Sequence, residues 1–330
     1  MKTTYSHLTE HDREQIDVLH RKGYTLSKIA QETGRSKGTI SRELSRNSSH
    51  TYGCYLSHRA EQRASARRSG ASQRPRLKSP AIKAYVLDNL NQDWSPEQIS
   101  GRIRTDHPGW AISPEAIYQY VYDSDTPNRK ELIHQLKRAH RIRRTKGLSR
   151  KMKKTKIPNR ISIEQRPAVV DSRQEFGHWE GDSIVSRASK TALNSLVERV
   201  SRLVRLGKLS RKSAKETIRV VASTLLQLPP HARRTITLDN GTENAGHETI
   251  TRMTGADCYF ARPYHSWERG TNENTNGLVR YYLPKGTDFA TISDEQVAFI
   301  ENRLNNRPRK CLNFSTPNEI ASHLGVALHG

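Results

Sequence analysis

The sequence predicts a multidomain protein in which all-α helical units precede an α/β domain built on a mixed sheet. Capped runs of apolar residues at helical spacing fill most of residues 8–125. From residue 176, short β-branched runs alternate with helical patterns. Basic stretches with few apolar residues separate these regions. The expected segments are 1–50 and 80–125 (helical domains), 51–79 and 126–170 (basic linkers) and 171–330 (α/β domain).

Residues 8–47 are expected to form three short helices. Thr9 is a suitable N-cap for the first, with Asp12 three positions later. The second covers residues 26–32. Ser36 is expected to cap the third, which runs from Lys37 to about residue 46.

The second and third helices have the spacing of a helix-turn-helix unit. Ala30 would let the helices approach closely, Gly34 would supply a positive-φ turn, and Ile40 would fill the core between them. A small helical bundle with a basic face is the alternative. In the helix-turn-helix interpretation, the third helix presents side chains suited to phosphates and base edges. The predicted DNA contacts there are Ser36, Lys37, Thr39, Arg42 and Arg46.

The charge of the chain favours a polyanionic partner. Lys and Arg number 56 and Asp and Glu 33, a formal net charge of +23. Residues 1–150 hold 28 basic against 15 acidic residues, and residues 151–330 hold 28 against 18, so the excess is not one tail. Nucleic acid is the usual partner of such a chain. The polar N-terminus, the lack of a long apolar run and three widely spaced cysteines predict a cytoplasmic protein with reduced thiols and no membrane partner.

The middle of the chain predicts a second helical unit between two basic segments. The Ser-Pro-Glu runs at residues 95–97 and 113–115 each place Ser at a cap and Pro at the first helical position. This unit is interpreted as a second helix-turn-helix or as a purely structural three-helix unit. Residues 59–80 are interpreted as a linker or an extended arm along DNA. Residues 137–156 hold eleven Lys or Arg and no acid, which predicts a DNA-contacting linker or a solvated tether.

Three carboxylates stand out in the α/β domain. Asp182 lies within an extended apolar run, Asp239 ends a β-branched run, and Glu273 lies ahead of an amphipathic stretch, with 33 residues between the last two. Hard divalent cations take such oxygen ligands. Two ions can activate an attacking oxygen and stabilise a leaving one at a phosphodiester.

The expected order of elements is three strands, a helix, a strand, a short helix, a strand and a helix. The strands are expected at residues 178–187, 192–201, 203–210, 235–238 and 257–261, and the last helix from about 271 to 282. This order resembles the ribonuclease-H-like fold of retroviral integrases and DDE transposases. There the first Asp lies within strand one, the second follows strand four, and the Glu lies on the helix after strand five.

Local motifs narrow the resemblance to the insertion-sequence-thirty family of bacterial transposases. They comprise residues 178–184 (HWEGDSI), 239–244 (DNGTEN), 267–277 (WERGTNENTNG), 282–286 (YLPKG), 302–310 (NRLNNRPRK) and 316–319 (TPNE). The helix-turn-helix units fit the same family, so the resemblance covers nearly the whole chain.

The resemblance implies a DNA transposase with Asp182, Asp239 and Glu273 as catalytic and metal-binding residues. It implies two Mg²⁺ ions per active site, for which Mn²⁺ is the alternative. The expected partners are double-stranded DNA, as terminal inverted repeats and target, and further copies of the chain in a dimer or larger synaptic assembly. The expected location is the bacterial cytoplasm, at the nucleoid. A non-catalytic DNA-binding regulator derived from a transposase, and a structure-specific ribonuclease, are the alternatives.

Other residues near the three carboxylates admit two interpretations. Glu180 shares a sheet face with Asp182 and would be a fourth carboxylate or a salt-bridge partner. Glu268 is the rival of Glu273, and Glu243 is expected only near the site. Arg280 lies seven residues, about two helical turns, after Glu273 and shares its helix face. We predict that Arg280 and Asn276 contact DNA; a polar stripe along the helix is the alternative.

Overall fold

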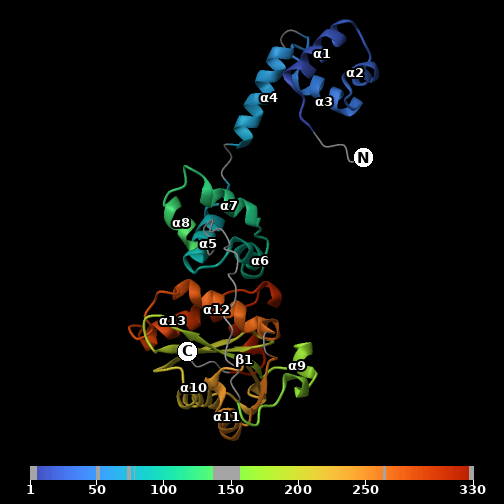
Figure 1. Ribbon diagram of the computed structural model, residues 1–330. Coiled ribbons are helices and arrows are strands. Elements are labelled where there is room, and N and C mark those ends of the chain that lie inside the picture. Colours follow the sequence, from blue (N-terminus) through green and yellow to red (C-terminus); the bar gives the residue numbers. More distant parts are fainter. Residues whose placement is uncertain are drawn as a thin grey trace. The chain divides into compact units, whose positions relative to one another are not determined.

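The computed structural model describes residues 6–49, 53–72, 76–77, 79–136, 157–262 and 265–326. The chain divides into two compact units, residues 1–78 and residues 79–330 (Figure 1). The eleven basic residues predicted to form a linker or tether at 137–156 lie outside the described residues. Within the described residues, no helix is long and apolar enough to cross a membrane.

The first unit contains the three predicted helices and a fourth: α1 (Glu10–Arg21), α2 (Leu26–Thr33), α3 (Lys37–Asn47) and α4 (Ser57–Ser72). The predicted caps are confirmed. Thr9 and Asp12 form a capping box, and the Ser36 hydroxyl accepts a hydrogen bond from the third backbone N–H of α3. Gly34 ends α2 with φ at +63°, and Ile40 is fully buried in the core between the helices, as the spacing predicts.

Helix α4 corrects the expectation of a linker or extended arm after residue 50. The helix packs on α1 through the buried side chains of Ala60 and Ala64. Arg63 donates to the carbonyl of Asn47 at 3.0 Å, and Arg67 donates to its side chain at 2.7 Å. Alanine buries little area per residue, so a pattern based on large apolar residues passes over this helix.

The second unit begins with helices α5 (Pro80–Asn91), α6 (Pro96–Asp106), α7 (Pro114–Tyr122) and α8 (Arg129–Gln135). Helices α5, α6 and α7 each have Ser at the N-cap and Pro at the first helical position. The sequence predicted this for α6 and α7. Helix α8 and the segment 157–172 correct the expectation of a linker over 126–170. Leu132 of α8 and Leu136, the C-cap residue of this helix, are buried. The 3-10 helix at Ile163–Gln165 and α9 (Val169–Ser172) precede the sheet.

A five-stranded mixed sheet forms the centre of the second unit. Its strands are β1 (His178–Val185), β2 (Ala192–Glu198), β3 (Val204–Leu209), β4 (Thr235–Leu238) and β5 (Asp257–Phe260). The spatial order is β3-β2-β1-β4-β5, with antiparallel pairing among the first three and parallel pairing from β1 to β4 and β5. Strands β1, β2, β3 and β5 end one to three residues earlier than predicted. Arg202, with φ at +63°, forms the turn between β2 and β3.

Helices cover both faces of the sheet (Figure 1). Helices α10 (Ala214–Leu226) and α11 (His247–Thr254) pack on one face. Helices α12 (Gly270–Tyr282) and α13 (Asp294–Asn305) pack on the other, and α14 (Pro317–His323) follows. Trp179 of β1 faces the first layer, whereas Ile184 faces the second. Because side chains alternate along a strand, Asp182 faces α12 with Ile184.

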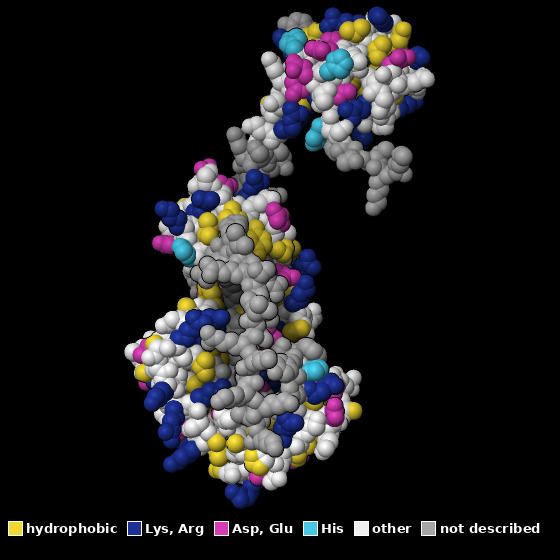
Figure 2. Space-filling view, in the orientation of Figure 1, with side chains coloured by type: hydrophobic (Ala, Val, Ile, Leu, Met, Phe, Trp, Pro, Cys, Tyr) yellow, Lys and Arg dark blue, Asp and Glu magenta, His cyan; other side chains and the backbone are white. Residues whose placement is uncertain are grey.

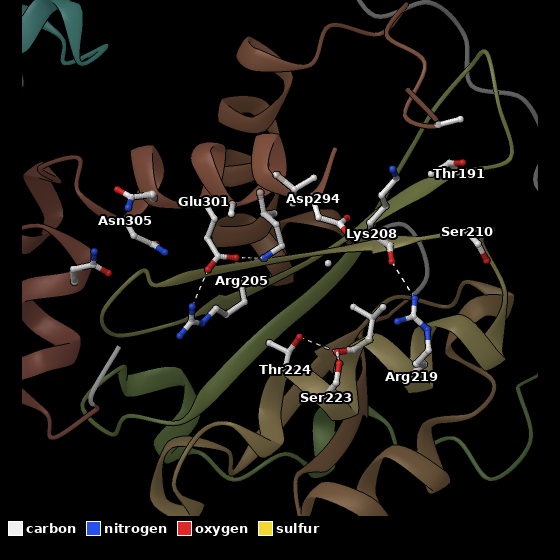
Figure 3. Close-up of a pocket in the computed structure, with 18 residues that line it drawn as sticks. Thr191, Arg205, Lys208, Ser210, Arg219, Ser223, Thr224, Asp294, Glu301 and Asn305 are labelled. Carbon is white, nitrogen blue, oxygen red and sulfur yellow. Dashed lines mark hydrogen bonds and ion pairs between the residues drawn. The ribbon is translucent and has the colours of Figure 1, made fainter. Parts of the chain in front are cut away.

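The outer edge of β3 is covered by side chains rather than by another strand. Asn305 both donates to and accepts from the backbone of Val204 at 2.8 Å, as a neighbouring strand would. Glu301 accepts a hydrogen bond from the Leu206 N–H at 2.6 Å, and Arg219 donates to the carbonyl of Lys208 on the same strand (Figure 3). The cavity of about 860 Å³ drawn in Figure 3 lies along this edge, between α10 and α13. These contacts blunt an edge that would otherwise pair with another chain.

Helix α6 contacts the C-terminal segment of the same unit. Arg102 binds the Glu319 carboxylate through both terminal nitrogens, one of them at 2.7 Å, and Gln98 donates to the carbonyl of Pro308. The ring of Phe314 lies where a Cβ on Gly101 would stand, so only glycine fits there. The arginine lowers the pKa of Glu319 to about 2.

We expect Glu319→Gln to destabilise the second unit at pH 7 and progressively less toward pH 2. A depressed pKa in the folded state contributes stability above the unfolded value of 4.5 that is lost as pH falls toward about 2. Because the Glu319 side chain is 38% exposed, solvent limits the effect to about 1 kcal/mol. Urea unfolding of both proteins at pH 7 and pH 3 measures the difference. A gap that is equal at both pH values would contradict this assignment.

Candidate active site

Asp182 lies in β1 and points toward α12. The backbone N–H of Ser183 donates to its Oδ1 at 2.9 Å, and the Asn276 amide donates to its Oδ2 at 2.7 Å. Asn276 is itself held by the Ser195 hydroxyl, 2.8 Å from its Oδ1. The carboxylate orientation is therefore fixed from its own strand, from β2 and from α12.

Asp239 is the first residue after β4, the strand that runs parallel to β1. The Gly241 N–H donates to its Oδ1 at 3.0 Å, and the Asn244 side chain donates to the same atom at 2.7 Å. Parallel neighbours end at the same edge of a sheet, which is where functional groups of such sheets gather. The predicted placements of Asp182 within strand one and Asp239 after strand four are confirmed.

Arg269 lies between the two aspartates. Its Nη1 is 3.6 Å from Asp182 Oδ1, and its Nη2 is 3.8 Å from Asp239 Oδ2. Both distances exceed those of a hydrogen bond. The guanidinium is held by a 3.0 Å hydrogen bond to the carbonyl of Gly181. Burial raises the pKa of the Asp182 carboxyl above its ordinary 3.8, Arg269 opposes that shift, and the nearby Asp239 adds to it.

Glu273 lies in the first turn of α12, as predicted, with its side chain exposed. At about 100° of rotation per residue, its position on the helix is only about 60° from that of Asn276, which contacts Asp182. The structure nevertheless does not bring all three predicted carboxylates together. Among the described residues, no three His, Cys, Asp or Glu side chains form a group that could hold a metal ion.

The remaining acids of the region have other partners. Buried Glu180 pairs with Arg199 at 2.9 Å and accepts the backbone N–H of Asn272 at 3.0 Å. The structure therefore favours the salt-bridge interpretation of Glu180, with a buried arginine in place of the surface partner that was expected. Glu268 binds both the backbone and the side chain of Arg262, at 2.8 and 2.7 Å.

The predicted DNA contacts on α12 have intramolecular partners in this structure. Both ends of the Asn276 amide are bonded, to Ser195 and Asp182. Arg280 donates to the carbonyl of Val185 at 2.6 Å, and its guanidinium lies 5.3 Å from the ring centroid of Phe289. Their contacts with DNA stay predictions.

On α3, the predicted contacts divide into two kinds. Ser36 and Thr39 form the cap of the helix, and their hydroxyls are 2.8 Å apart. Lys37, Arg42 and Arg46 are exposed, so their charges are available to a ligand. Lys and Arg side chains are also spread over the visible face of both units (Figure 2).

Sequence reasoning missed Arg269 and Asn244 and gave Asn276 another role. Arg269 belongs to the motif at residues 267–277, but nothing in that motif indicates that its side chain approaches both Asp182 and Asp239. The spacing of Asn272 and Asn276 is a usable signal, since residues four apart share a helix face. Both amides face the sheet: Asn272 bonds the carbonyl of Glu180, and Asn276 bonds Asp182.

Several known proteins are similar to this chain in sequence. Residues 4–47 match the model of a helix-turn-helix domain family. The chain is 37% identical to the transposase for insertion sequence element IS4351 of Bacteroides fragilis, over 95% of this chain and 94% of that protein. It is 37% identical to the transposase InsI for insertion sequence element IS30A of Escherichia coli, over 99% and 86%. Among solved structures, the catalytic core domain of BIV integrase matches at 18% identity and a TM-score of 0.36, over 45% of this chain and 95% of that one.

A helix-turn-helix DNA-binding unit followed by a ribonuclease-H-like mixed sheet defines a polynucleotidyl transferase that acts on DNA. The strand order and the matched relatives agree on this class. The chain belongs to the insertion-sequence-thirty family of bacterial transposases.

Proposed function

We propose that this transposase binds the terminal inverted repeats of its insertion sequence and catalyses Mg²⁺-dependent strand cleavage and strand transfer. The observation that carries the proposal is the approach of Asp182 and Asp239 to one guanidinium group, that of Arg269, where β4 ends beside β1. Hydrogen bonds to Ser183, Asn276, Gly241 and Asn244 orient these two carboxylates.

The aspartate pair fits a divalent cation. Carboxylate oxygens are the ligands that Mg²⁺ and Mn²⁺ take, and the Arg269 guanidinium stands where positive charge is needed. Asp182 and Asp239 would hold the metal, and Glu273, in the first turn of α12, would complete its protein ligands when the metal binds. Two bound cations supply activation of the attacking oxygen and stabilisation of the leaving one.

The protein's own residues would prepare the DNA strand for in-line attack. Arg269 and Arg280 would offer guanidinium groups to phosphates near the aspartates, in the bidentate manner typical of arginine. Water attacks the phosphodiester at the element's end, which frees the 3′-OH of the element and leaves a 5′-phosphate on the flanking DNA. The freed 3′-OH then attacks a phosphodiester of the target strand, forms the new bond and releases a 3′-OH of that strand. No protein nucleophile is needed. Because two ends are cut and joined together, we propose that a dimer or larger assembly acts.

A nicking assay on terminal-repeat duplex DNA, with and without Mg²⁺, tests this function. The proposal expects metal-dependent cleavage at the repeat end followed by joining to target DNA. Binding without cleavage would support the non-catalytic regulator instead. Preferential cleavage of an RNA strand in a hybrid would support a ribonuclease.

The exposed arginine of α3 provides a test of sequence recognition. We expect Arg42→Ala to weaken binding to the terminal repeat by about 10- to 100-fold, the effect of losing a bidentate base contact of about 1–3 kcal/mol. Binding to random duplex should fall much less. Lys28→Ala on α2, where Lys28 pairs with Glu32, is the matched control. Equal losses on both DNAs would reassign Arg42 as a phosphate contact.

A further inference from the structure

A second cavity, of about 330 Å³, lies beside the start of α12 and is rich in arginine. Three separate segments supply its basic side chains: Arg173 follows α9, Arg202 lies in the turn between β2 and β3, and Arg309 precedes the 3-10 helix at Lys310–Leu312. Its other lining residues are Gly270, Thr271, Asn274, Thr275 and Cys311. We call it the arginine cavity.

Among the described residues, no carboxylate forms an ion pair with the arginine side chains of this cavity, although Glu180 partly offsets the charge of Arg173 and opposes the lowering of its pKa. None of its lining residues is acidic. No ion pair among the described residues involves Arg173, Arg202 or Arg309, and those residues include every Asp and Glu of the chain. The neighbouring Arg199 differs, because it pairs with Glu180. Three clustered guanidinium groups without a carboxylate are unfavourable unless an anion joins them.

The protein itself holds two of these guanidinium groups in place. Arg202 donates to the Thr271 hydroxyl at 2.7 Å, and Arg309 donates to the carbonyl of Leu304 at 3.0 Å. Their Nε atoms are buried and have no hydrogen-bond partner among the described residues. Burial lowers the pKa of Arg309 to about 10, and burial together with Arg202 lowers the pKa of Arg173. The charged forms would gain from a bound anion.

We propose that the arginine cavity binds a backbone phosphate of the DNA strand that reacts at Asp182 and Asp239. This inference rests on the proposed function, because it adds a positioning contact to the same site. Fork-shaped guanidinium groups match phosphate oxygens, and the backbone N–H groups at the start of a helix add further donors. The cavity is at the small end of ligand pockets, which suits one anionic group rather than a nucleotide.

The position of the arginine cavity on α12 fits a neighbouring phosphate. Thr271 and Asn276 are five residues apart, about 7.5 Å along the helix axis. Phosphates along one DNA strand are spaced by about 3.4 Å of axial rise. Thr271 and Asn276 are also about 140° apart around the axis of a helix about 10 Å across, so a phosphate in the cavity would lie on the order of 12 Å, or a few nucleotides, from the one at Asp182. None of the three carboxylates lines the cavity, so other side chains would clamp the strand there.

The salt dependence of DNA binding tests the proposal in the full chain. Each lost phosphate contact reduces the slope of log Kobs against log salt by about 0.9. We expect the double variant Arg173→Gln, Arg202→Gln to lower the slope by about 0.9, the effect of one lost phosphate contact, measured on terminal-repeat duplex. Arg252→Gln, an exposed arginine of α11, is the matched control and should leave the slope unchanged. An unchanged slope in the double variant overturns the proposal.

Cys311 provides a local readout, since it is exposed and lines the arginine cavity. In a Cys54→Ser background Cys311 is the accessible thiol, because Cys258 is buried. Terminal-repeat DNA should slow its reaction with a thiol reagent, and the double variant should lose that protection. Inorganic phosphate at equal ionic strength distinguishes the sources: protection by phosphate but not by DNA overturns the DNA contact. The Asp182→Asn protein should keep the protection, so a failure of catalysis and a failure of the cavity are distinguishable.

Discussion

Asp182→Asn and Asp239→Asn are each expected to lower the rates of strand cleavage and strand transfer by about 10³-fold or more. Each replacement exchanges a charged carboxylate near the Arg269 guanidinium for a neutral amide. The charge stabilisation that a metal supplies at a phosphodiester is several kcal/mol. A loss of about 4 kcal/mol corresponds to about 10³-fold in rate. Single-turnover assays on terminal-repeat DNA measure both steps.

Asp257→Asn is the matched control for this pair. Asp257 is exposed at the start of β5, where it lies opposite Thr235, at the other end of the parallel strands from Asp239. We expect it to retain full activity. Binding of the terminal repeat should be intact in all three variants, since the helix-turn-helix unit is unchanged. Joining by the Asp182→Asn or Asp239→Asn protein at the wild-type rate would remove that residue from the catalytic set.

Stability separates a catalytic role of Asp182 from a structural one. Burial, together with Asp239, raises the pKa of this carboxyl in the folded protein. An acid whose pKa is raised on folding loses stability as pH rises above its unfolded value of 3.8. The metal-free Asp182→Asn protein should therefore be at least as stable as wild type at pH 7 by thermal unfolding. An inactive variant that also unfolds at a markedly lower temperature would indicate structural damage.

The sequence was most informative where the signal is local. Alternation along β1 correctly placed Glu180 and Asp182 on one face, because side-chain direction in a strand has a fixed period of two. Capping by Thr9, Ser36 and Ser95 was predictable for the same reason: the donor and acceptor are three residues apart. The order of strands and helices from β1 to α12 followed from such local patterns.

Contacts between distant segments could not be predicted in this way. Asn305 covers the edge of β3 from 101 positions away, and Arg269 approaches Asp182 and Asp239, which precede it by 87 and 30 residues. Neither pairing leaves a periodic trace in one sequence. The Glu180–Arg199 ion pair depends on the antiparallel register of β1 and β2, which hydrophobic patterning alone does not reveal. Local signals thus placed the carboxylates, whereas the residues that hold them required the structure.

Replacement of Glu273, the third predicted carboxylate, is also expected to cause a large loss of activity. We expect Glu273→Gln to lower cleavage and strand transfer by about 10³-fold, as for the aspartates, whereas Glu268→Gln should retain most activity. Glu273 is exposed on α12 beside Asn276, and no ion pair among the described residues involves it, so its charge is available to a metal. The Glu268 carboxylate already accepts hydrogen bonds from the backbone and the side chain of Arg262.

Metal binding provides the decisive measurement for this pair of variants. Calorimetric titration with Mn²⁺ should show weaker binding to the Glu273→Gln protein than to wild type, with Glu268→Gln unchanged. The two replacements remove the same charge five residues apart, so a general electrostatic effect would weaken both proteins alike. Loss of Mn²⁺ binding and activity in Glu268→Gln, with both retained in Glu273→Gln, would reverse the assignment. That outcome would place the third ligand in the 3-10 helix at Ser266–Arg269, and α12 would serve only to hold Asp182 through Asn276.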